Sequence, residues 1–132
     1  MITALDSSVL LAIVKNEASA QAWIALLVKL RASGSLAIAE VAWAETRPWF
    51  HSRSAQITAM ESLGVRFLPV TEEASALAGE IYGDYRRAGG TRQKILSDFL
   101  IGAHALVQAH QLASADDGFF RTYFRGLKIA AI

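Results

Sequence analysis

The run Ile2-Thr3-Ala4-Leu5-Asp6-Ser7-Ser8-Val9-Leu10-Leu11 opens the chain and decides how it folds. Its first four residues form a short apolar run, which is typical of a buried strand, and the run ends at Asp6. Ser7 and Ser8 are residue types that cap helices, and the apolar stretch to Val14 follows them. A strand that leads directly into a helix begins a βα unit. We therefore expect Asp6 at the carboxyl end of the first strand of a parallel sheet.

The rest of the chain repeats this alternation of short apolar runs and longer helical patterns. Further strands are expected at residues 36–38, 65–68, 112–114 and 127–130, and helices at residues 18–32, 40–52, 54–63, 71–88, 97–110 and 119–123. The alternation predicts an α/β fold, a helix-rich three-layer α/β/α domain with a mostly parallel central sheet. Ligands bind such sheets outside the carboxyl ends of the strands. Asp6, and Asp116 after the strand at 112–114, are therefore expected at the ligand-binding edge.

The composition limits the class of protein. With 132 residues, the chain is expected to form a single domain over residues 1–132. Because it contains no cysteine, a disulfide scaffold, a thiolate metal site and a cysteine nucleophile are excluded. The formal net charge of +1 gives no general attraction to nucleic acid, so a local patch must hold any such partner. No apolar stretch reaches membrane-spanning length and no basic segment precedes the first apolar run, which predicts a cytoplasmic protein without a membrane partner.

Two further carboxylates occupy positions that a structural role alone does not explain. On a helix, Glu45 shares its face with apolar side chains such as Val41 and Trp49. A carboxylate in such a place is costly unless a cation compensates it. Asp98 begins the most apolar helix of the chain and is followed by Phe99-Leu100-Ile101. The helix dipole favours an acid at this end, but a buried helix start that holds a carboxylate is better explained by a cation.

Together, Asp6, Glu45, Asp98 and Asp116 predict a site for a hard cation. Mg²⁺ and Mn²⁺ prefer oxygen ligands, retain several waters and hold phosphate groups in such sites. The chemistry that follows is hydrolysis of a phosphodiester. Taken singly, Asp6 as a helix cap and Asp116 as a turn residue also have purely structural interpretations. Glu40 lies on a different helix face from Glu45 and is interpreted as a first-turn or capping acid.

Four blocks of the sequence resemble the signature blocks of PIN domains, and most closely those of the VapC-type toxins of bacterial toxin–antitoxin pairs. They are residues 5–11, the pair Ala44-Glu45, residues 97–106 and residues 112–119, and they occur in the family's order over nearly the whole chain. The resemblance implies a metal-dependent endoribonuclease that leaves 5′-phosphate and 3′-hydroxyl ends on RNA. It also implies a homodimer that a VapB-type antitoxin silences.

Residue by residue, the resemblance assigns the catalytic and metal-binding acids. Asp6 matches the first family acid, Glu45 the second, Asp98 the third and Asp116 the fourth. Ser114 matches a hydroxyl residue two positions before the fourth acid and is assigned a supporting role.

The chain departs from the family's pattern in two places. Asp117 stands where the family often has a basic or polar residue, so either Asp116 or Asp117 points into the site. Arg47-Pro48-Trp49 stands where leucine and small residues are common. Because proline breaks the hydrogen-bond pattern of a helix, Pro48 is expected to reshape the surface near Glu45.

Basic side chains just before Asp98 are candidates for contact with RNA. They surround Gly89-Gly90 and are Arg86, Arg87, Arg92 and Lys94. The functional interpretation is a clamp for RNA phosphates at the rim of the acidic site. The alternative is a solvated loop with helix C-terminal charges.

Aromatic and histidine side chains have competing interpretations. Tyr123 and Phe124 either stack on bases or belong to the core, and the core is favoured for Phe119. His104 is interpreted as part of a polar stripe rather than as a general base. The large apolar area that Trp49 and the other tryptophans provide is divided between the core and a face for a dimer or an antitoxin.

Two other classes of function compete with the nuclease. One is a non-catalytic binding module that keeps the PIN fold, which the presence of all four acids argues against. The other is a different Mg²⁺-dependent phosphoryl-transfer enzyme, since an aspartate after the first strand also suits a phosphatase or a receiver domain. Against the phosphatase, Ser7-Ser8 follows Asp6 without a second aspartate two residues on.

Overall fold

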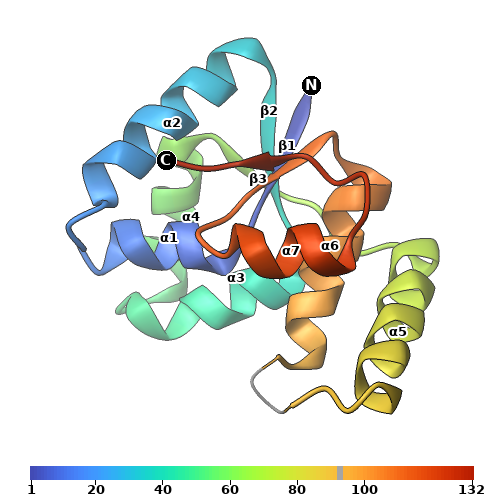
Figure 1. Cartoon of the computed structure of the whole chain (residues 1–132). Coiled ribbons are helices and arrows are strands. Elements are labelled where there is room, and N and C mark those ends of the chain that lie inside the picture. The colour runs from blue at the N-terminus through green and yellow to red at the C-terminus, as the bar shows by residue number, and fades with distance from the viewer. Residues whose placement is uncertain (92–93) are drawn as a thin grey trace.

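The computed structural model describes residues 1–91 and 94–132, and in these residues five parallel strands form one sheet (Figure 1). The strands are β1 (Ile2–Leu5), β2 (Ser35–Ile38), β3 (Val65–Phe67), β4 (Gln111–Ala113) and β5 (Ile129–Ala130). Their order across the sheet is β3-β2-β1-β4-β5. The predicted α/β class with a parallel central sheet is therefore confirmed.

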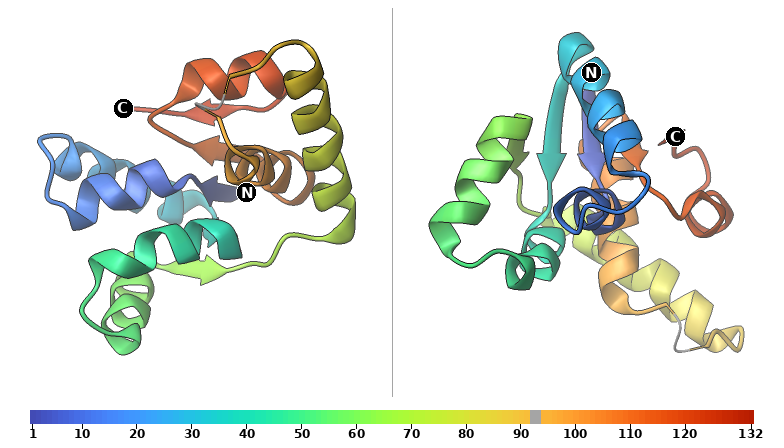
Figure 2. Two further views of the ribbon diagram at one scale, coloured as in Figure 1. Left: turned by 90° about the horizontal axis from the view of Figure 1, so that it is seen from below. Right: turned by 90° about the vertical axis from the view of Figure 1, so that its left-hand side faces the viewer.

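Helices cover both faces of this sheet. They are α1 (Ser7–Val14), α2 (Ala20–Ser33), α3 (Glu40–Thr46), α4 (Arg53–Leu63), α5 (Glu72–Arg87), α6 (Leu96–Gln108) and α7 (Asp117–Tyr123). Seen along the strands, α1 and α2 lie on one face and α5 and α6 on the other (Figure 2). The strands β1, β2 and β4 are mostly buried, and strands buried on both faces read as continuous apolar runs, whereas β3 and β5 at the edges are more exposed. No helix within the described residues is long and apolar enough to cross a membrane.

The helix expected at residues 40–52 is shorter than predicted. It ends at Thr46, and Arg47–Trp49 form a single 3-10 turn that contains Pro48. Proline has no N–H to continue the α-helical pattern, so the chain turns and α4 begins at a new cap. That cap is Ser52, whose hydroxyl accepts a hydrogen bond from the Ala55 N–H at 3.1 Å. Gly64 ends α4 with a φ of 74°, in the left-handed region that glycine adopts without strain.

An aromatic cluster forms the core between α5, α6 and α7. Phe99 is fully buried at its centre, and the rings of Tyr82, Tyr85, Phe119, Tyr123 and Phe124 lie 5.2 to 6.4 Å from it. Phe119 and Phe124 are buried, whereas Tyr123 keeps 37% of its surface exposed. Two of the three aromatic residues considered for base stacking are thus core residues, and Tyr123 remains available.

Gly102 of α6 is required by the close approach of Phe124. A Cβ added at Gly102 would lie 2.4 Å from the Phe124 ring, and both residues are buried. We expect Gly102→Ala to lower the free energy of unfolding by about 1–3 kcal/mol through overpacking. Gly79→Ala on α5 is the matched control, because nothing lies within 4 Å of its Cβ position and alanine should stabilise the helix by roughly 0.5–1 kcal/mol. Urea unfolding of both variants measures the difference, and equal effects would contradict the packing argument.

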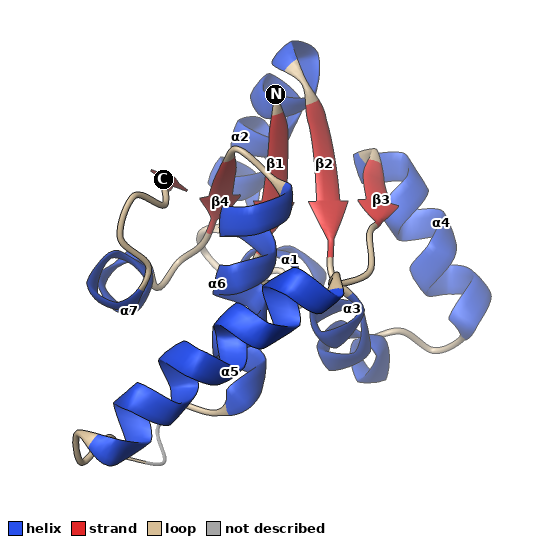
Figure 3. Ribbon diagram, turned by 90° about the vertical axis from the view of Figure 1, so that its right-hand side faces the viewer, coloured by secondary structure: helices blue, strands red, loops and turns tan. Residues whose placement is uncertain are grey.

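The order of the strands opens a crevice at the carboxyl edge of the sheet. From the central strand β1 the chain moves to β2 and β3 on one side, then returns to β4 and β5 on the other. The connections after β1 and after β4 run toward opposite sides of the sheet. Ligands bind open α/β sheets at such a point, outside the carboxyl ends of the two strands. The strands point toward the side of the molecule where α1 and α7 begin (Figure 3). Leu5 pairs with Ala113, so the next residues, Asp6 and Ser114, emerge side by side.

Candidate active site

Asp6 is held firmly at the end of β1. Its backbone N–H donates to the Ala113 carbonyl at 3.0 Å, which extends the ladder between β1 and β4 by one residue. Its side chain is 6% exposed, and Oδ2 accepts hydrogen bonds from the hydroxyls of Ser114 at 2.7 Å and Ser8 at 2.8 Å. A carboxylate that two hydroxyls bind through one oxygen has a fixed orientation and keeps lone pairs for a further ligand.

The two serines also connect Asp6 to the loop that carries Asp116. Ser114 is fully buried, and its Oγ accepts the N–H of Asp116 at 2.9 Å while it donates to Asp6. Ser8 Oγ accepts the N–H of Ala115 at 3.1 Å. The loop after β4 is therefore positioned by the same hydroxyls that orient Asp6. Ser7 and Ser8 were predicted to cap the helix, but the N-cap position is Asp6 and both serines lie in the first turn of α1, where Ser8 binds Asp6 and Ala115 instead.

Glu45 projects from α3 with one oxygen bonded and the other unsatisfied. Its Oε2 accepts a hydrogen bond from the Ser97 hydroxyl at 3.3 Å. Its Oε1 is buried and has no hydrogen-bond partner among the described residues. Buried carboxylate oxygens are normally paired, so an orphaned one calls for a ligand that the protein chain does not supply. Of the apolar neighbours predicted for Glu45, Val41 packs against the core, whereas Trp49 lies beyond the end of α3 and is 53% exposed.

Asp98 lies in the first turn of α6 and faces the other acids. Its Oδ2 accepts the backbone N–H of Ile95 at 3.0 Å, which satisfies one free donor at the helix start. The structural interpretation of Asp98 as a helix-terminal acid therefore explains one of its two oxygens. It does not explain the second oxygen or the negative charge, which acts on both Asp6 and Glu45.

Of the two neighbouring aspartates after β4, Asp116 faces the acids and Asp117 does not. Asp116 accepts a hydrogen bond from the Lys94 ammonium, and its charge acts on Asp6. Asp117 is exposed in the first turn of α7, where Arg121, one helical turn later, pairs with it at 3.5 Å. The structure thus brings together Asp6, Glu45, Asp98 and Asp116, and it leaves Asp117 outside.

Burial and neighbouring charges raise the pKa values of Asp6 and Glu45. Burial is the main cause that raises the pKa of Asp6; the hydrogen bonds from Ser114 and Ser8 lower it, and the charges of Asp98 and Asp116 raise it again. The pKa of Glu45 is raised as well, again chiefly by burial; hydrogen bonding with Ser7 and Ser97 lowers it, and the charges of Asp98 and Asp6 raise it. Carboxylates that repel one another in a partly dry site are stabilised by a cation.

These acids fit a divalent cation of the hard class. Their ligand atoms are all oxygens. The Oε1 atom of Glu45 is buried and unpaired among the described residues, so its lone pairs are free to bind a cation. Within residues 1–91 and 94–132, no three His, Asp or Glu side chains are arranged to hold a metal directly. Mg²⁺ is commonly bound through one or two carboxylates and several waters, so this spacing suits partly water-mediated binding.

Lys94 is the basic residue that pairs with one of these acids among the described residues. Its ammonium pairs with Asp116 and lies 4.8 Å from the centre of the Phe119 ring. Burial lowers the pKa of Lys94, but the bond to Asp116 and the charges of Asp116, Asp98 and Asp6 outweigh it, so the pKa is raised. Lys94 also lines a cavity of about 400 Å³ with Arg86.

Arg87 and His104 make their contacts away from the acids. Arg87 is exposed on α5, where it pairs with Asp84 one turn earlier, and Arg92 lies outside the described residues. His104 is 1% exposed, and its Nε2 lies 2.8 Å from the Leu68 carbonyl oxygen. Burial lowers the pKa of His104, which keeps it neutral and structural. Glu40 has a structural role too, since its Oε1 accepts the Val70 N–H at 2.9 Å.

The raised pKa of Asp6 predicts how stability depends on pH without metal. Because the folded-state pKa lies above the unfolded value, the stabilisation from protonated Asp6 is complete below about pH 3.8 and is lost as the pH rises through the folded pKa. In a chelator, Asp6→Asn should therefore raise the melting temperature near pH 7 and have little effect near pH 4. The exposed Asp117→Asn is the control and should change neither value. A gain for Asp6→Asn that is the same at both pH values would contradict this account.

The chain matches a protein family model and several solved structures. A family model for the PIN domain matches residues 3–125. Among solved structures, the chain is similar to VapBC2 from Rickettsia felis bound to a DNA fragment from their promoter, with a TM-score of 0.76, 15% identity and coverage of 99% of this chain and 98% of that one. It is also similar to VapBC-1 from nontypeable Haemophilus influenzae, with a TM-score of 0.71, 20% identity and coverage of 99% and 98%. DNA-bound VapBC from Salmonella typhimurium matches with a TM-score of 0.70, 17% identity and the same coverage. At these identities the likeness concerns the fold, and no curated protein matches the sequence.

Proposed function

The chain belongs to the PIN domain family, and on that premise we propose that it is a divalent-metal-dependent endoribonuclease, the toxin of a VapC-type toxin–antitoxin pair. PIN domains are generally nucleases. The observation that carries the proposal is the convergence of Asp6, Glu45, Asp98 and Asp116 at the carboxyl edge of the sheet, with the Oε1 atom of Glu45 buried and unpaired. Burial and the charges of neighbouring acids raise the pKa of Asp6 and Glu45, so this cluster of carboxylates destabilises the fold unless a cation accompanies it.

The four acids would hold Mg²⁺ or Mn²⁺, in part through water. When bound, the cation supplies positive charge for the scissile phosphate and makes a water molecule more acidic. The chain's own contribution is orientation. Ser8 and Ser114 fix the Asp6 carboxylate and Ser97 positions Glu45, so the acids need little rearrangement before the reaction.

The basic side chains near the acids would position the substrate. Lys94 and Arg86 line one cavity at the rim, where their charges suit the phosphates on either side of the scissile bond. His104 is excluded as the proton acceptor by its burial and its contact with Leu68. The proton of the attacking water would therefore pass to a site carboxylate, and Asp6 and Glu45 are the two whose pKa is raised, chiefly by burial.

We further propose an antitoxin partner and a homodimer in the cytoplasm. The solved complexes that share this fold include VapBC and FitAB assemblies. In this chain Trp49 is 53% exposed and Phe67 is 50% exposed, and the Phe67 ring lies edge-to-face on Trp43 at 5.3 Å. Exposed aromatic area of this kind suits burial against another chain. Light scattering over a dilution series tests the dimer, and a monomer at every concentration would contradict it.

The nuclease proposal is tested by incubating the purified protein with structured RNA and, in parallel, with single-stranded DNA of the same sequence. Each substrate is tested with Mg²⁺, with Mn²⁺ and with chelator. We expect cleavage of RNA with either metal, 5′-phosphate and 3′-hydroxyl ends, and a loss of rate in chelator of at least ~10³-fold. Cleavage that survives chelation would overturn the metal dependence, and cleavage of DNA alone would overturn the RNA specificity.

The competing functions predict other results. A binding module would bind its partner without metal and would cleave neither substrate. A different phosphoryl-transfer enzyme would form a covalent aspartyl phosphate from a small phosphodonor, with the phosphate on Asp6 as the residue nearest the strand end. A binding module does not account for the unpaired Oε1 of Glu45, and the match to the PIN domain model favours a nuclease over the other phosphoryl-transfer enzyme.

A further inference from the structure

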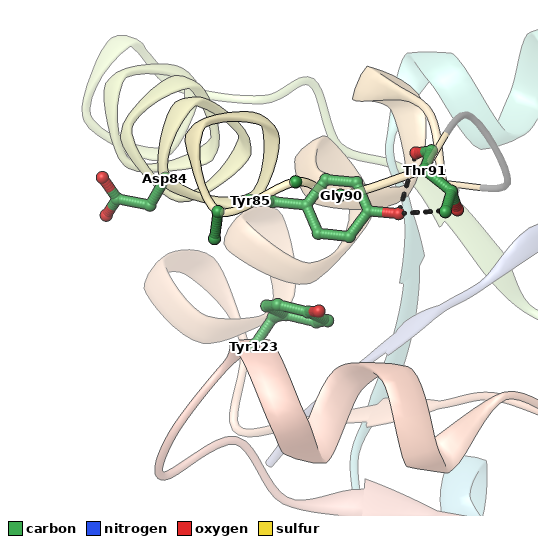
Figure 4. A pocket seen from close by; sticks show the side chains of 7 residues that line it. Asp84, Tyr85, Gly90, Thr91 and Tyr123 are labelled. Atoms are coloured by element: carbon green, nitrogen blue, oxygen red, sulfur yellow. Dashed lines mark hydrogen bonds between the residues drawn. The ribbon is translucent and has the colours of Figure 1, made fainter.

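A cavity of about 550 Å³ lies beside the acidic site, where the end of α5 and the following turn meet α7. Its walls include Tyr85 and Gly90 on one side and Tyr123 on the other (Figure 4). The volume lies within the usual range for pockets that bind small organic groups. None of the four acids belongs to its lining, so this cavity is distinct from the proposed metal site.

The tyrosine walls of the cavity are rigid. The Tyr85 hydroxyl donates to the Thr91 carbonyl oxygen at 2.8 Å, and its ring meets the Tyr123 ring edge-to-face with centroids 5.3 Å apart (Figure 4). A Cβ at Gly90 would lie 2.5 Å from the Tyr85 ring, so only glycine lets this turn lie against the tyrosine. Tyr85 is 9% exposed and serves as a fixed wall. Tyr123, at 37% exposed, offers ring surface to a ligand.

The charges around the cavity favour a neutral aromatic group inside and phosphates outside. Among the described residues of its lining, the charged one is Asp84, whose carboxylate is paired with Arg87 and points away from the tyrosines in Figure 4. The described part of the lining therefore offers an anionic group no cation. Arg86 and Lys94 line the neighbouring cavity of about 400 Å³ instead. An aromatic wall with cations next to it is the arrangement that binds single-stranded nucleic acid.

The cavity is linked to the acids by three consecutive contacts. The Tyr123 ring packs on Phe119 with centroids 5.3 Å apart, Lys94 lies over that same Phe119 ring, and Lys94 pairs with Asp116. A group seated on Tyr123 is thus separated from Asp116 by one ring and one lysine. A nucleotide bound there would be a neighbour of the scissile phosphate along the strand, and not the reacting group itself.

We propose that this cavity binds one unpaired nucleobase of single-stranded RNA, stacked on the Tyr123 ring, and so contributes to the choice of cleavage site. The inference rests on the proposed ribonuclease function. Stacking needs the π-face of the ring and not its hydroxyl, so the phenylalanine variant should retain it. Leucine at position 123 keeps an apolar side chain against Phe119 and Tyr85 but offers no aromatic face.

The test is the binding of a fluorescein-labelled, short single-stranded RNA, followed by fluorescence anisotropy in chelator so that no cleavage occurs. Tyr123→Leu should weaken binding by roughly tenfold, within the range of one base–aromatic stack, while Tyr123→Phe should stay within about twofold of the wild type. Val28→Ala is the control, because it removes an exposed apolar side chain outside the cavity and should leave the affinity unchanged. A series of RNAs, each with one abasic site at a different position, locates the bound base. At one position, the abasic RNA should bind the wild type and Tyr123→Leu with the same affinity.

The outcomes separate the subsite from the function. If the wild type binds and cleaves RNA and Tyr123→Leu binds it equally well, the subsite is overturned and the nuclease remains. If the wild type neither binds nor cleaves RNA, both proposals fail. Circular dichroism and thermal melting of Tyr123→Leu establish that it is folded, and if it is not, Tyr123→Met takes its place with the same expected loss relative to Tyr123→Phe.

Discussion

Asp98→Asn is expected to reduce RNA cleavage by at least ~10³-fold while the protein remains folded, since it removes one of the charges that hold the cation. The substitution is chosen for its geometry. The amide oxygen of asparagine can still accept the Ile95 N–H that now bonds to Asp98 Oδ2 at 3.0 Å, so the start of α6 keeps its cap. Initial rates on RNA with saturating Mn²⁺ and the melting temperature in chelator measure the two effects separately.

The matched control for Asp98→Asn is Asp117→Asn. Both variants remove one negative charge from the first turn of a helix, but Asp117 is exposed and pairs with Arg121 away from the acids. We expect Asp117→Asn to retain the wild-type rate within about twofold. Wild-type cleavage by Asp98→Asn, or an equal loss in both variants, would contradict the assignment of Asp98.

The sequence could locate those site residues whose positions are indicated by the pattern of their own segment. Asp6 and Asp116 could be predicted because the carboxyl ends of parallel strands meet at one edge, and the pairing of Leu5 with Ala113 places the following residues together. Glu45 could be predicted because helical periodicity shows apolar neighbours such as Val41, and in the structure its Oε1 atom is buried. All five strands were found at their predicted places, since each is a short apolar run between turn or helix signals.

Contacts between side chains from distant segments carried no such signal. Ser97 and Glu45 are 52 positions apart, and their hydrogen bond depends on how α3 packs against α6. The choice between Asp116 and Asp117 depends on the backbone at the start of α7, which directs one side chain inward and the next to solvent. Pro48 was expected to reshape the helix after Glu45, and the structure shows where: α3 ends at Thr46.

Lys94→Met is the second substitution for which we expect a large effect, and it acts in opposite directions with and without metal. The Lys94 ammonium pairs with Asp116 and also interacts with the charges of Asp98 and Asp6, so in the metal-free protein it offsets part of their repulsion. Methionine keeps much of the apolar stem over the Phe119 ring and removes only the charge. The melting temperature of the variant in chelator should therefore fall below that of the wild type.

The same substitution should strengthen metal binding, because a positive charge beside the acids opposes a second cation. At the effective dielectric of a partly exposed site, with the Lys94 side chain 30% exposed, the removal of this charge should lower the dissociation constant for Mn²⁺ by on the order of tenfold. Isothermal titration with Mn²⁺ measures the affinity. Melting with and without Mn²⁺ should show a larger metal-induced rise in melting temperature for the variant than for the wild type.

Lys15→Met is the control, because Lys15 also lies over an aromatic ring, at 4.0 Å from the centre of the Trp49 ring, and has no contact with the acids among the described residues. If Lys94→Met binds Mn²⁺ with the wild-type affinity, the lysine does not compete with the metal, and its pairing with Asp116 serves only to order the segment that leads into α6.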